Sequence, residues 1–408
     1  MNQDSTPTFY GLGIAPKLLE VLTKKKFTTP TPIQQRSIPV ALEGKDLVGI
    51  AQTGTGKTLA FGIPLLQHLA ASEKAQGLIL VPTRELAIQV EETLNSIGTP
   101  LGIKSAVIIG GANMRMQIQQ LKRNPQLIIA TPGRLLDHIQ SRSVRLASVK
   151  VLVLDEADRM LDMGFAPQIN KILAGVPKER QTMLFSATMP NEIVKIASQY
   201  MQLPLRVEVA PAGTAAEKVV HEVFFVPKQA KIQLLASLLK QYRGTVLVFV
   251  RTKHGAKKAC RDLRAMDHKA AEIHGNRTLN QRKEALNGFK TGRYRVLVAT
   301  DIAARGIDVS AIELVINFDL PTNSEDYVHR IGRTGRAGMA GRAISFATPE
   351  QSRDVRNIER LIRMALPVSK IPQDLPHIPK TPYTHPSASP RGRSPQHRQR
   401  RPFQRRRR

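Results

Sequence analysis

The sequence predicts an α/β protein of two tandem domains, each built around a parallel β-sheet. Two observations carry this prediction. Runs of four to six aliphatic residues without polar alternation recur along the chain, as expected for strands buried on both faces of a parallel sheet. Amphipathic helical stretches separate these runs, and the alternation stops once near residue 210 and then begins again. A length of 408 residues allows two or three domains at roughly 150 residues each.

The first domain is expected over residues 1–208. It begins with a helical region over residues 9–43, in which a Thr/Pro-rich break at residues 27–32 precedes a second helix from about residue 33 to residue 42. The short aliphatic runs that follow have strand length and lack polar alternation. The expected strands of this domain are residues 46–50, 78–81, 106–109, 127–130, 149–154 and 182–185.

The alternation pauses over Pro204–Lys218, so we expect a linker at residues 209–218 and a second α/β domain at residues 219–370. Two domains joined by a short linker create a cleft, which is a common location for ligands. The expected strands of the second domain are residues 219–226, 245–250, 270–273, 295–299, 314–318 and 343–347.

Residues 371–408 differ in character, with eight Pro, nine Arg and few aliphatic residues. Such a segment buries too little apolar surface to offset its ordering entropy, so we expect a disordered Arg/Pro-rich tail. The tail could serve as an electrostatic tether for nucleic acid or as a solubilising end. The use of arginine almost to the exclusion of lysine favours the tether.

The strongest global signal is the net charge of +29. Residues 391–408 hold nine Arg and no acid, which leaves 29 − 9 = +20 on residues 1–390. The excess therefore extends over the folded part, and nucleic acid is favoured over anionic lipid because no amphipathic membrane helix accompanies the charge.

No apolar run approaches the roughly 20 residues that span a bilayer. The polar Met1–Thr8 lacks a signal-peptide core, and a single cysteine, Cys260, fits a cytoplasmic protein.

A glycine-rich turn between a short buried strand and a helix start predicts a phosphate-binding loop. Glycines let the backbone aim several N–H groups at one anion, and the helix adds its positive end. Lys57 would supply an ammonium for the β- and γ-phosphates, and Thr58 a hydroxyl ligand for Mg²⁺. The loop reads Ala51-Gln52-Thr53-Gly54-Thr55-Gly56-Lys57-Thr58, with Ala51 where the general pattern has Gly.

A second chemical motif, Asp155-Glu156-Ala157-Asp158, directly follows the buried run Val151–Leu154. A carboxylate at the C-terminal end of such a strand faces the crevice where α/β folds bind ligands. We expect Asp155 to hold Mg²⁺ opposite Thr58, and Glu156 to orient and deprotonate the attacking water. The alternative is an acidic turn that caps the next helix. The phosphate-binding loop earlier in the chain weighs against that alternative.

Further short motifs occur in a fixed order with the phosphate loop and the Asp155–Asp158 (DEAD) motif. They are Lys26–Gln34 (KFTTPTPIQ), Pro82–Ala87 (PTRELA), Gly110-Gly111, Thr131–Arg134 (TPGR), Ser186–Thr188 (SAT), Val248–Lys253 (VFVRTK), Ala299–Asp308 (ATDIAARGID) and His329–Gly338 (HRIGRTGRAG). Over about residues 9–350, this ordered set resembles the DEAD-box RNA helicases of superfamily 2. The resemblance implies two RecA-like domains and an ATP-dependent enzyme that unwinds short RNA duplexes or remodels RNA–protein complexes. The motif wording and the basic tail suggest the bacterial RhlE-like branch.

By resemblance, the ATP site takes residues from both domains. The amide of Gln34 has a donor and an acceptor that can pair with the adenine edge, which would select ATP over GTP. Arg333 and Arg336 would act as arginine fingers, each contributing roughly 10³-fold or more in rate by analogy with GTPases. Hydrolysis then requires closure, because these arginines and the general base lie on different domains. Further nucleotide-binding residues implied are Phe9, Phe27, Thr53, Gly54, Thr55, Gly56 and, for the ribose, Asp301.

The resemblance also implies a set of RNA contacts. No aromatic residue is interleaved with them, so we expect recognition of the sugar–phosphate backbone that is nearly independent of sequence. Asp158 is expected to bond to Ser186 or Thr188 and so to couple the nucleotide site to the RNA face. The implied RNA contacts are Arg84, Gly110, Gly111, Thr131 and Arg134 in the first domain, and Arg251, Thr252, Thr300 and Arg305 in the second.

Two residues depart from the family pattern, and neither belongs to the hydrolytic set. Lys26 replaces the usual Gly of the adenine motif. Leu279 stands where the family prefers Gln in the second domain, although Arg282 is retained. The departure at Leu279 weakens the prediction of one second-domain RNA contact.

Two other functions stay open at the level of sequence. One is a DNA-directed helicase of the same superfamily, which would respond to DNA as well as to RNA. The other is a non-enzymatic RNA clamp or annealing protein, with the tail supplying most of the binding. The complete set of hydrolytic residues argues against the clamp. Ribosomal or RNA-decay proteins are expected partners, and a membrane is not.

Overall fold

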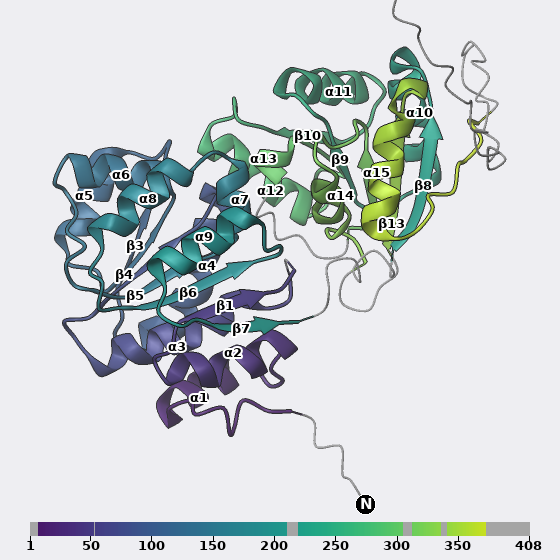
Figure 1. Cartoon of the computed structure of the whole chain (residues 1–408). Coiled ribbons are helices and arrows are strands. Elements are labelled where there is room, and N and C mark those ends of the chain that lie inside the picture. Colours follow the sequence, from purple (N-terminus) through teal and green to yellow (C-terminus); the bar gives the residue numbers. More distant parts are fainter. Residues whose placement is uncertain (1–6, 53, 210–218, 305–311, 336–340, 373–408) are drawn as a thin grey trace, which may run out of the picture.

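The computed structural model describes residues 7–52, 54–209, 219–304, 312–335 and 341–372. Figure 1 shows two α/β lobes, the first lobe at lower left and the second lobe at upper right. The first lobe comprises the described residues up to Val209, and the second lobe those from Val219 onward. The predicted fold class, two RecA-like units with parallel sheets, is confirmed.

In the described chain, the first lobe contains a seven-stranded sheet in the order β3-β4-β2-β5-β6-β1-β7. Neighbouring strands are parallel throughout. The strands are β1 (Leu47–Ile50), β2 (Gln76–Leu80), β3 (Ser105–Ile108), β4 (Leu127–Ala130), β5 (Val149–Leu154), β6 (Gln181–Ser186) and β7 (Leu205–Glu208). The helices are α1 (Pro16–Lys24), α2 (Pro32–Leu42), α3 (Lys57–Ala71), α4 (Arg84–Gly98), α5 (Met114–Lys122), α6 (Pro132–Gln140), α7 (Ala157–Asp162), α8 (Ala166–Gly175) and α9 (Asn191–Tyr200), with a 3₁₀ turn η1 at Thr99–Leu101.

Both faces of this sheet are buried, which explains the unbroken aliphatic runs in the sequence. Successive strand residues point to opposite faces, so Ile79 packs in the core under α3 and α4, while Leu80 packs in the core under α6, α8 and α9. The first core also takes the inner faces of α1 and α2. Phe9, which precedes these helices, is buried in the same core.

The structure corrects two predictions for the first lobe. Residues 9–15 are not helical, and α1 begins only at Pro16, whose fixed φ suits the first position of a helix. The pause over residues 204–218 contains a strand, β7, which pairs in parallel with β1. Three of its four residues are exposed, so this edge strand lacks the aliphatic signal by which the central strands were found.

In the described chain, the second lobe contains a six-stranded parallel sheet in the order β10-β11-β9-β12-β13-β8. Every strand predicted for this lobe is present, with small shifts at the ends. The strands are β8 (Val219–Phe225), β9 (Val246–Phe249), β10 (Ala270–Ile273), β11 (Val296–Ala299), β12 (Leu314–Asn317) and β13 (Gly341–Ala347). The helices are α10 (Lys231–Gln241), α11 (Lys253–Ala265), α12 (Leu279–Lys290), α13 (Asp301–Ala304), α14 (Ser324–Ile331) and α15 (Ser352–Ile362), with 3₁₀ turns η3 (Lys228–Ala230) and η4 (Pro349–Gln351).

In the part of the second lobe that the structure describes, the buried apolar residues form three cores. One lies under α10 and α11, one under α12, and one under α14 and α15. Among the described helices, none is long and apolar enough to cross a membrane. Of the linker predicted at residues 209–218 only Val209 is described, and of the tail predicted at residues 371–408 only Ile371 and Pro372 are described. The remainder of both segments lies outside the described residues.

Asp46, just before β1, is predicted to stabilise the edge of the first sheet. Its Oδ1 accepts the buried backbone N–H of Thr182 at 2.6 Å, and its Oδ2 accepts that of Gln202 at 2.7 Å. Asp46→Ala leaves both donors without this partner and should cost roughly 2–4 kcal/mol in the free energy of unfolding of the first lobe. Asp46→Asn keeps one acceptor and should cost less. Urea titration with amide hydrogen exchange in β6 measures both, and an Ala variant as stable as the wild type would contradict the prediction.

Candidate nucleotide and RNA site

The phosphate-binding loop leaves β1 and enters α3 at Lys57. Gly56 has φ +90°, and a Cβ atom there would collide with the amide nitrogen of Gln34, so only glycine fits. Lys57 is 6% exposed, and within the described residues its ammonium has no hydrogen-bond partner. A buried cation without a partner is costly. The loop therefore presents a buried positive charge that a bound anion would neutralise. Thr53 lies outside the described residues.

Gln34 is tied directly to this loop. Its Nε2 donates to the Gly56 carbonyl at 2.9 Å, and its Oε1 accepts the Thr31 N–H at 2.9 Å as part of a capping box for α2. Each amide atom can make one further hydrogen bond. The predicted adenine-reading residue is thus positioned by the phosphate loop itself, a contact that sequence reasoning missed.

Two buried carboxylates lie at the end of β5. Asp155 and Glu156 are 2% and 4% exposed, and Glu156 adopts the left-handed conformation at φ 50°, ψ 50°. Burial raises the pKa of Asp155 to about 6, the Lys57 ammonium opposes that rise, and the Glu156 carboxylate adds to it. The predicted phosphate-binding lysine and the predicted metal-binding carboxylate are therefore close enough to interact electrostatically.

The coupling contact predicted for Asp158 is made with Thr188. Asp158 Oδ2 accepts the Thr188 N–H at 3.0 Å, the Thr188 hydroxyl at 3.0 Å and the Ala187 N–H at 3.1 Å. The hydroxyl of Ser186 is buried without a hydrogen-bond partner within the described residues. Of the two partners that the sequence left open, the structure selects Thr188.

The second lobe presents Arg333 just after α14, where it is 4% exposed. Asp301, predicted to bind the ribose, accepts Arg330 Nε at 2.6 Å and Arg330 Nη2 at 2.7 Å, one donor on each carboxylate oxygen. The carboxylate is therefore engaged by Arg330, which the sequence did not anticipate. Arg336 and Arg305 lie outside the described residues.

The predicted RNA contacts of the first lobe come together. Arg84, the first residue of α4, packs beside Gly110 and Gly111, and a Cβ atom at Gly111 would collide with its guanidinium. Arg134 Nη1 donates to the Ala112 carbonyl at 3.0 Å, which places it at the same loop. Thr131 is the N-cap residue of α6.

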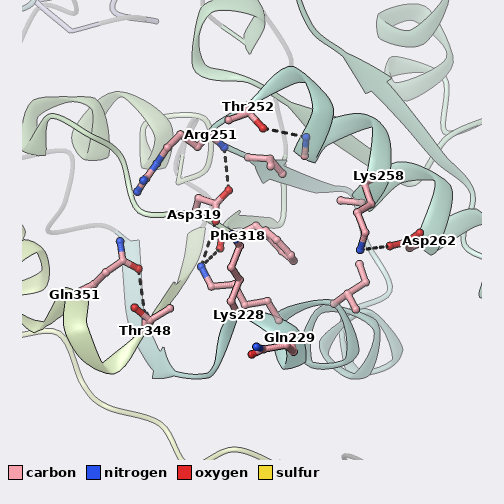
Figure 2. Close-up of a pocket in the computed structure, with 15 residues that line it drawn as sticks. Lys228, Gln229, Arg251, Thr252, Lys258, Asp262, Phe318, Asp319, Thr348 and Gln351 are labelled. Carbon is pink, nitrogen blue, oxygen red and sulfur yellow. Dashed lines mark hydrogen bonds and ion pairs between the residues drawn. The ribbon is translucent and has the colours of Figure 1, made fainter.

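In the second lobe, Arg251 and Thr252 line a pocket of about 680 Å³ at the end of β9 (Figure 2). Thr252 Oγ1 accepts the Gly255 N–H and so caps α11, while the Arg251 N–H donates to Asp319 at 3.1 Å. Thr300 follows β11 and is 9% exposed. Three further cations that lie outside the motifs line the same pocket, and sequence reasoning missed them: Lys228, Lys231 and Lys258.

Among the described residues, two buried ion pairs join the lobes. Arg282 Nη2 lies 2.8 Å from Glu85 Oε2, and Arg159 Nη1 lies 2.6 Å from Asp326 Oδ1. Arg282 belongs to the second-lobe segment that departs from the family pattern at Leu279. In the structure, Arg282 contacts a carboxylate of the first lobe. Neither pair could be predicted from the sequence, because each joins residues far apart in the chain.

One RecA-like lobe carries a phosphate-binding loop and two buried carboxylates, and the other carries buried arginines. This arrangement is typical of nucleotide-driven enzymes of the helicase class. Residues 31–196 match the DEAD/DEAH box helicase family, and residues 230–338 match the helicase conserved C-terminal domain. The chain belongs to the DEAD-box RNA helicases and is an ATP-dependent RNA helicase.

Relatives with known names agree with this assignment. The chain is 42% identical over 368 residues to ATP-dependent rRNA helicase RRP3 of Debaryomyces hansenii, covering 90% of this chain and 77% of the relative. It is 42% identical over 366 residues to DEAD-box ATP-dependent RNA helicase 30 of Arabidopsis thaliana, covering 88% and 62%. Both relatives are eukaryotic, so they give no support to the bacterial RhlE-like assignment.

Solved structures of helicases in complex match both lobes together. S. cerevisiae Dbp5 bound to RNA and ADP BeF3 is similar with a TM-score of 0.80 at 31% identity, over 90% of this chain and 96% of that one. DEAD-box helicase Mss116 bound to ssRNA and UDP-BeF is similar with a TM-score of 0.82 at 28% identity, over 89% and 79%. Because these alignments span both lobes, the lobes of this chain are arranged much as in those complexes.

The raised pKa of Asp155 predicts a pH-dependent effect on stability. Because this pKa is raised, the native state binds the proton of Asp155 more tightly than the unfolded chain does. The stability that this proton contributes is therefore lost as the pH rises through about 6. Asp155→Asn removes the buried charge, and should raise the free energy of unfolding by up to about 3 kcal/mol above pH 7 and by little near pH 4.

Thermal unfolding at pH 4 and pH 8 measures this effect. Asp137→Asn, which changes an exposed carboxylate, is the matched control and should show no such gain. A stability difference between Asp155→Asn and the wild type that is the same at both pH values would contradict the prediction.

Proposed function

We propose that ATP binds between the lobes and that its hydrolysis is coupled to their closure on the RNA backbone. The observation that carries this proposal is the buried ammonium of Lys57, which lies beside Asp155 with no hydrogen-bond partner in the described chain. An anion of phosphate type would complete it. We assign the first lobe to residues 1–208, the linker to residues 209–218 and the second lobe to residues 219–370. Each lobe has its own part in hydrolysis.

The proposed hydrolytic residues have distinct roles. Lys57 holds the β- and γ-phosphates, Glu156 orients and deprotonates the attacking water, and Arg333 and Arg336 stabilise the transition-state charge from the second lobe. Around the rest of the nucleotide we place Phe9, Phe27, Gln34, Thr53, Gly54, Thr55, Gly56 and Asp301. Glu156 lies just beyond β5 and has a left-handed backbone conformation that is sparsely populated for non-glycine residues. Such a constrained backbone supports the role of a base held in a fixed position.

Mg²⁺ is part of the proposal. The hydroxyl of Thr58 and the carboxylate of Asp155 are hard oxygen donors of the kind that this ion prefers, and they belong to the two loops that follow β1 and β5. When bound, the ion would neutralise charge on the β- and γ-phosphates. The ion must replace any proton on Asp155, so its binding is expected to weaken below about pH 6.

RNA would cross both lobes through its sugar–phosphate backbone. The clustering of Arg84, Gly110, Gly111 and Arg134 supports this path, since glycine allows close approach and arginine supplies charge. We place the remaining contacts at Thr131, Arg251, Thr252, Thr300 and Arg305. The name of the RRP3 relatives points to ribosomal RNA as the substrate, with ribosomal or RNA-decay proteins as partners and the cytoplasm as the location expected from sequence.

The proposal is tested by steady-state ATPase with no nucleic acid, with RNA and with DNA of the same sequence. We expect strong stimulation of the ATPase rate by RNA, and weak stimulation by DNA because 2′-hydroxyls are absent. The Glu156→Gln variant should lose at least about 10²-fold in ATPase rate. Glu156→Gln should still bind RNA in the presence of ATP. Equal stimulation by DNA would favour the DNA-directed alternative. RNA binding without any ATPase would favour the non-enzymatic clamp.

A further inference from the structure

We propose that Arg159 is a positioning residue that links the hydrolysis-coupling segment of the first lobe to the arginine-bearing helix of the second lobe through Asp326. The inference rests on the proposed closure of the lobes. It concerns a residue outside the segments that define the nucleotide and RNA sites.

The contact itself is short and buried. Arg159 Nη1 donates to Asp326 Oδ1 at 2.6 Å, and the two side chains are 4% and 13% exposed. Arg159 belongs to α7, the helix that begins inside the Asp155–Asp158 motif, and Asp326 belongs to α14. A charge-assisted bond in a site with little water is strong when made and costly to leave half-made. The pair therefore favours the arrangement in which both lobes meet.

On the first-lobe side, Arg159 is joined to the coupling contact. Its backbone N–H donates to Asp158 Oδ1 at 2.9 Å, while Asp158 Oδ2 holds the backbone and hydroxyl of Thr188. Asp158 thus uses one oxygen for Thr188 and the other for Arg159. A change at the Ser186–Thr188 segment displaces the backbone from which the Arg159 side chain extends.

On the second-lobe side, Asp326 lies one helical turn before Arg330 on α14, and Arg333 follows at the end of the helix. Arg330 fixes this helix to the sheet through Asn317 at 3.1 Å and the Asp319 carbonyl at 2.6 Å, besides its bidentate pair with Asp301. Because α14 is fixed in this way, it carries Asp326 and Arg333 as one body. The contact between Asp326 and Arg159 therefore determines the position of Arg333 relative to the first lobe.

The packing around the pair leaves little room for adjustment. Arg159, Asp326, Arg330 and Arg333 line a common cavity of only about 10 Å³, which is enough for at most a single water molecule. When the lobes separate, both charges regain water. Loss of the pair should therefore impair closure and RNA-stimulated hydrolysis, while nucleotide binding to the first lobe alone persists.

A charge-swap cycle on the full chain tests the proposal. The variants are Arg159→Asp, Asp326→Arg and the double substitution that carries both. The matched control exchanges the exposed pair Arg293 and Glu284, which lies within the second lobe at 3.1 Å. The readouts are kcat and KM for RNA in the ATPase assay, unwinding of a short duplex, and nucleotide affinity without RNA.

Each single variant should lose at least about tenfold in RNA-stimulated kcat/KM, and the double variant should recover to within about threefold of the wild type. Nucleotide affinity without RNA and the control pair should be unchanged. Single variants with wild-type rates, or a double variant as slow as the product of the two single losses, would overturn the proposal. A wild-type chain without RNA-stimulated ATPase would instead overturn the proposed function on which it rests.

Discussion

In the first lobe, the loop after β1 buries the ammonium of Lys57 close to the carboxylates of Asp155 and Glu156 that follow β5. Lys57 lacks a hydrogen-bond partner in the described chain, and burial raises the pKa of Asp155 to about 6. In the proposed mechanism, a bound polyphosphate would neutralise the Lys57 ammonium, and a divalent cation would neutralise the carboxylates. Arg333, which follows α14, belongs to the other lobe. In the proposed mechanism, the charge of the nucleotide is therefore fully balanced only when the lobes close.

The parallel sheet explains how residues far apart in the chain reach this site. Strands β5, β6 and β1 are neighbours, and the loops that follow them carry the Asp155–Asp158 motif, Ser186–Thr188 and the phosphate loop. The carboxyl ends of parallel strands lie at one edge of a sheet, which is where α/β folds bind ligands. Asp158 then joins two of these loops through Thr188, and Gln34 joins α2 to the third.

Most of the fold could be predicted because the central strands are buried on both faces and show as unbroken aliphatic runs. The strand at Leu205–Glu208 escaped prediction because its exposed edge position removes that signal. Within the site, the motifs located Lys57, Asp155 and Glu156, since their spacing from strand ends is local. Partners of buried charges could not be predicted, because the bonds of Arg330 to Asp301 and of Arg159 to Asp326 depend on tertiary packing.

Closure of the lobes on RNA can be measured in solution as a change in the distance between them. Dyes attached after Met116→Cys and Met266→Cys, exposed positions on the first and second lobes, would report that separation by energy transfer. The native Cys260 is buried, which raises its pKa to about 11 and makes it slow to label. We expect a closed population only when RNA and a non-hydrolysable ATP analogue are both present. Closure with the nucleotide alone, or no change with both ligands, would contradict it.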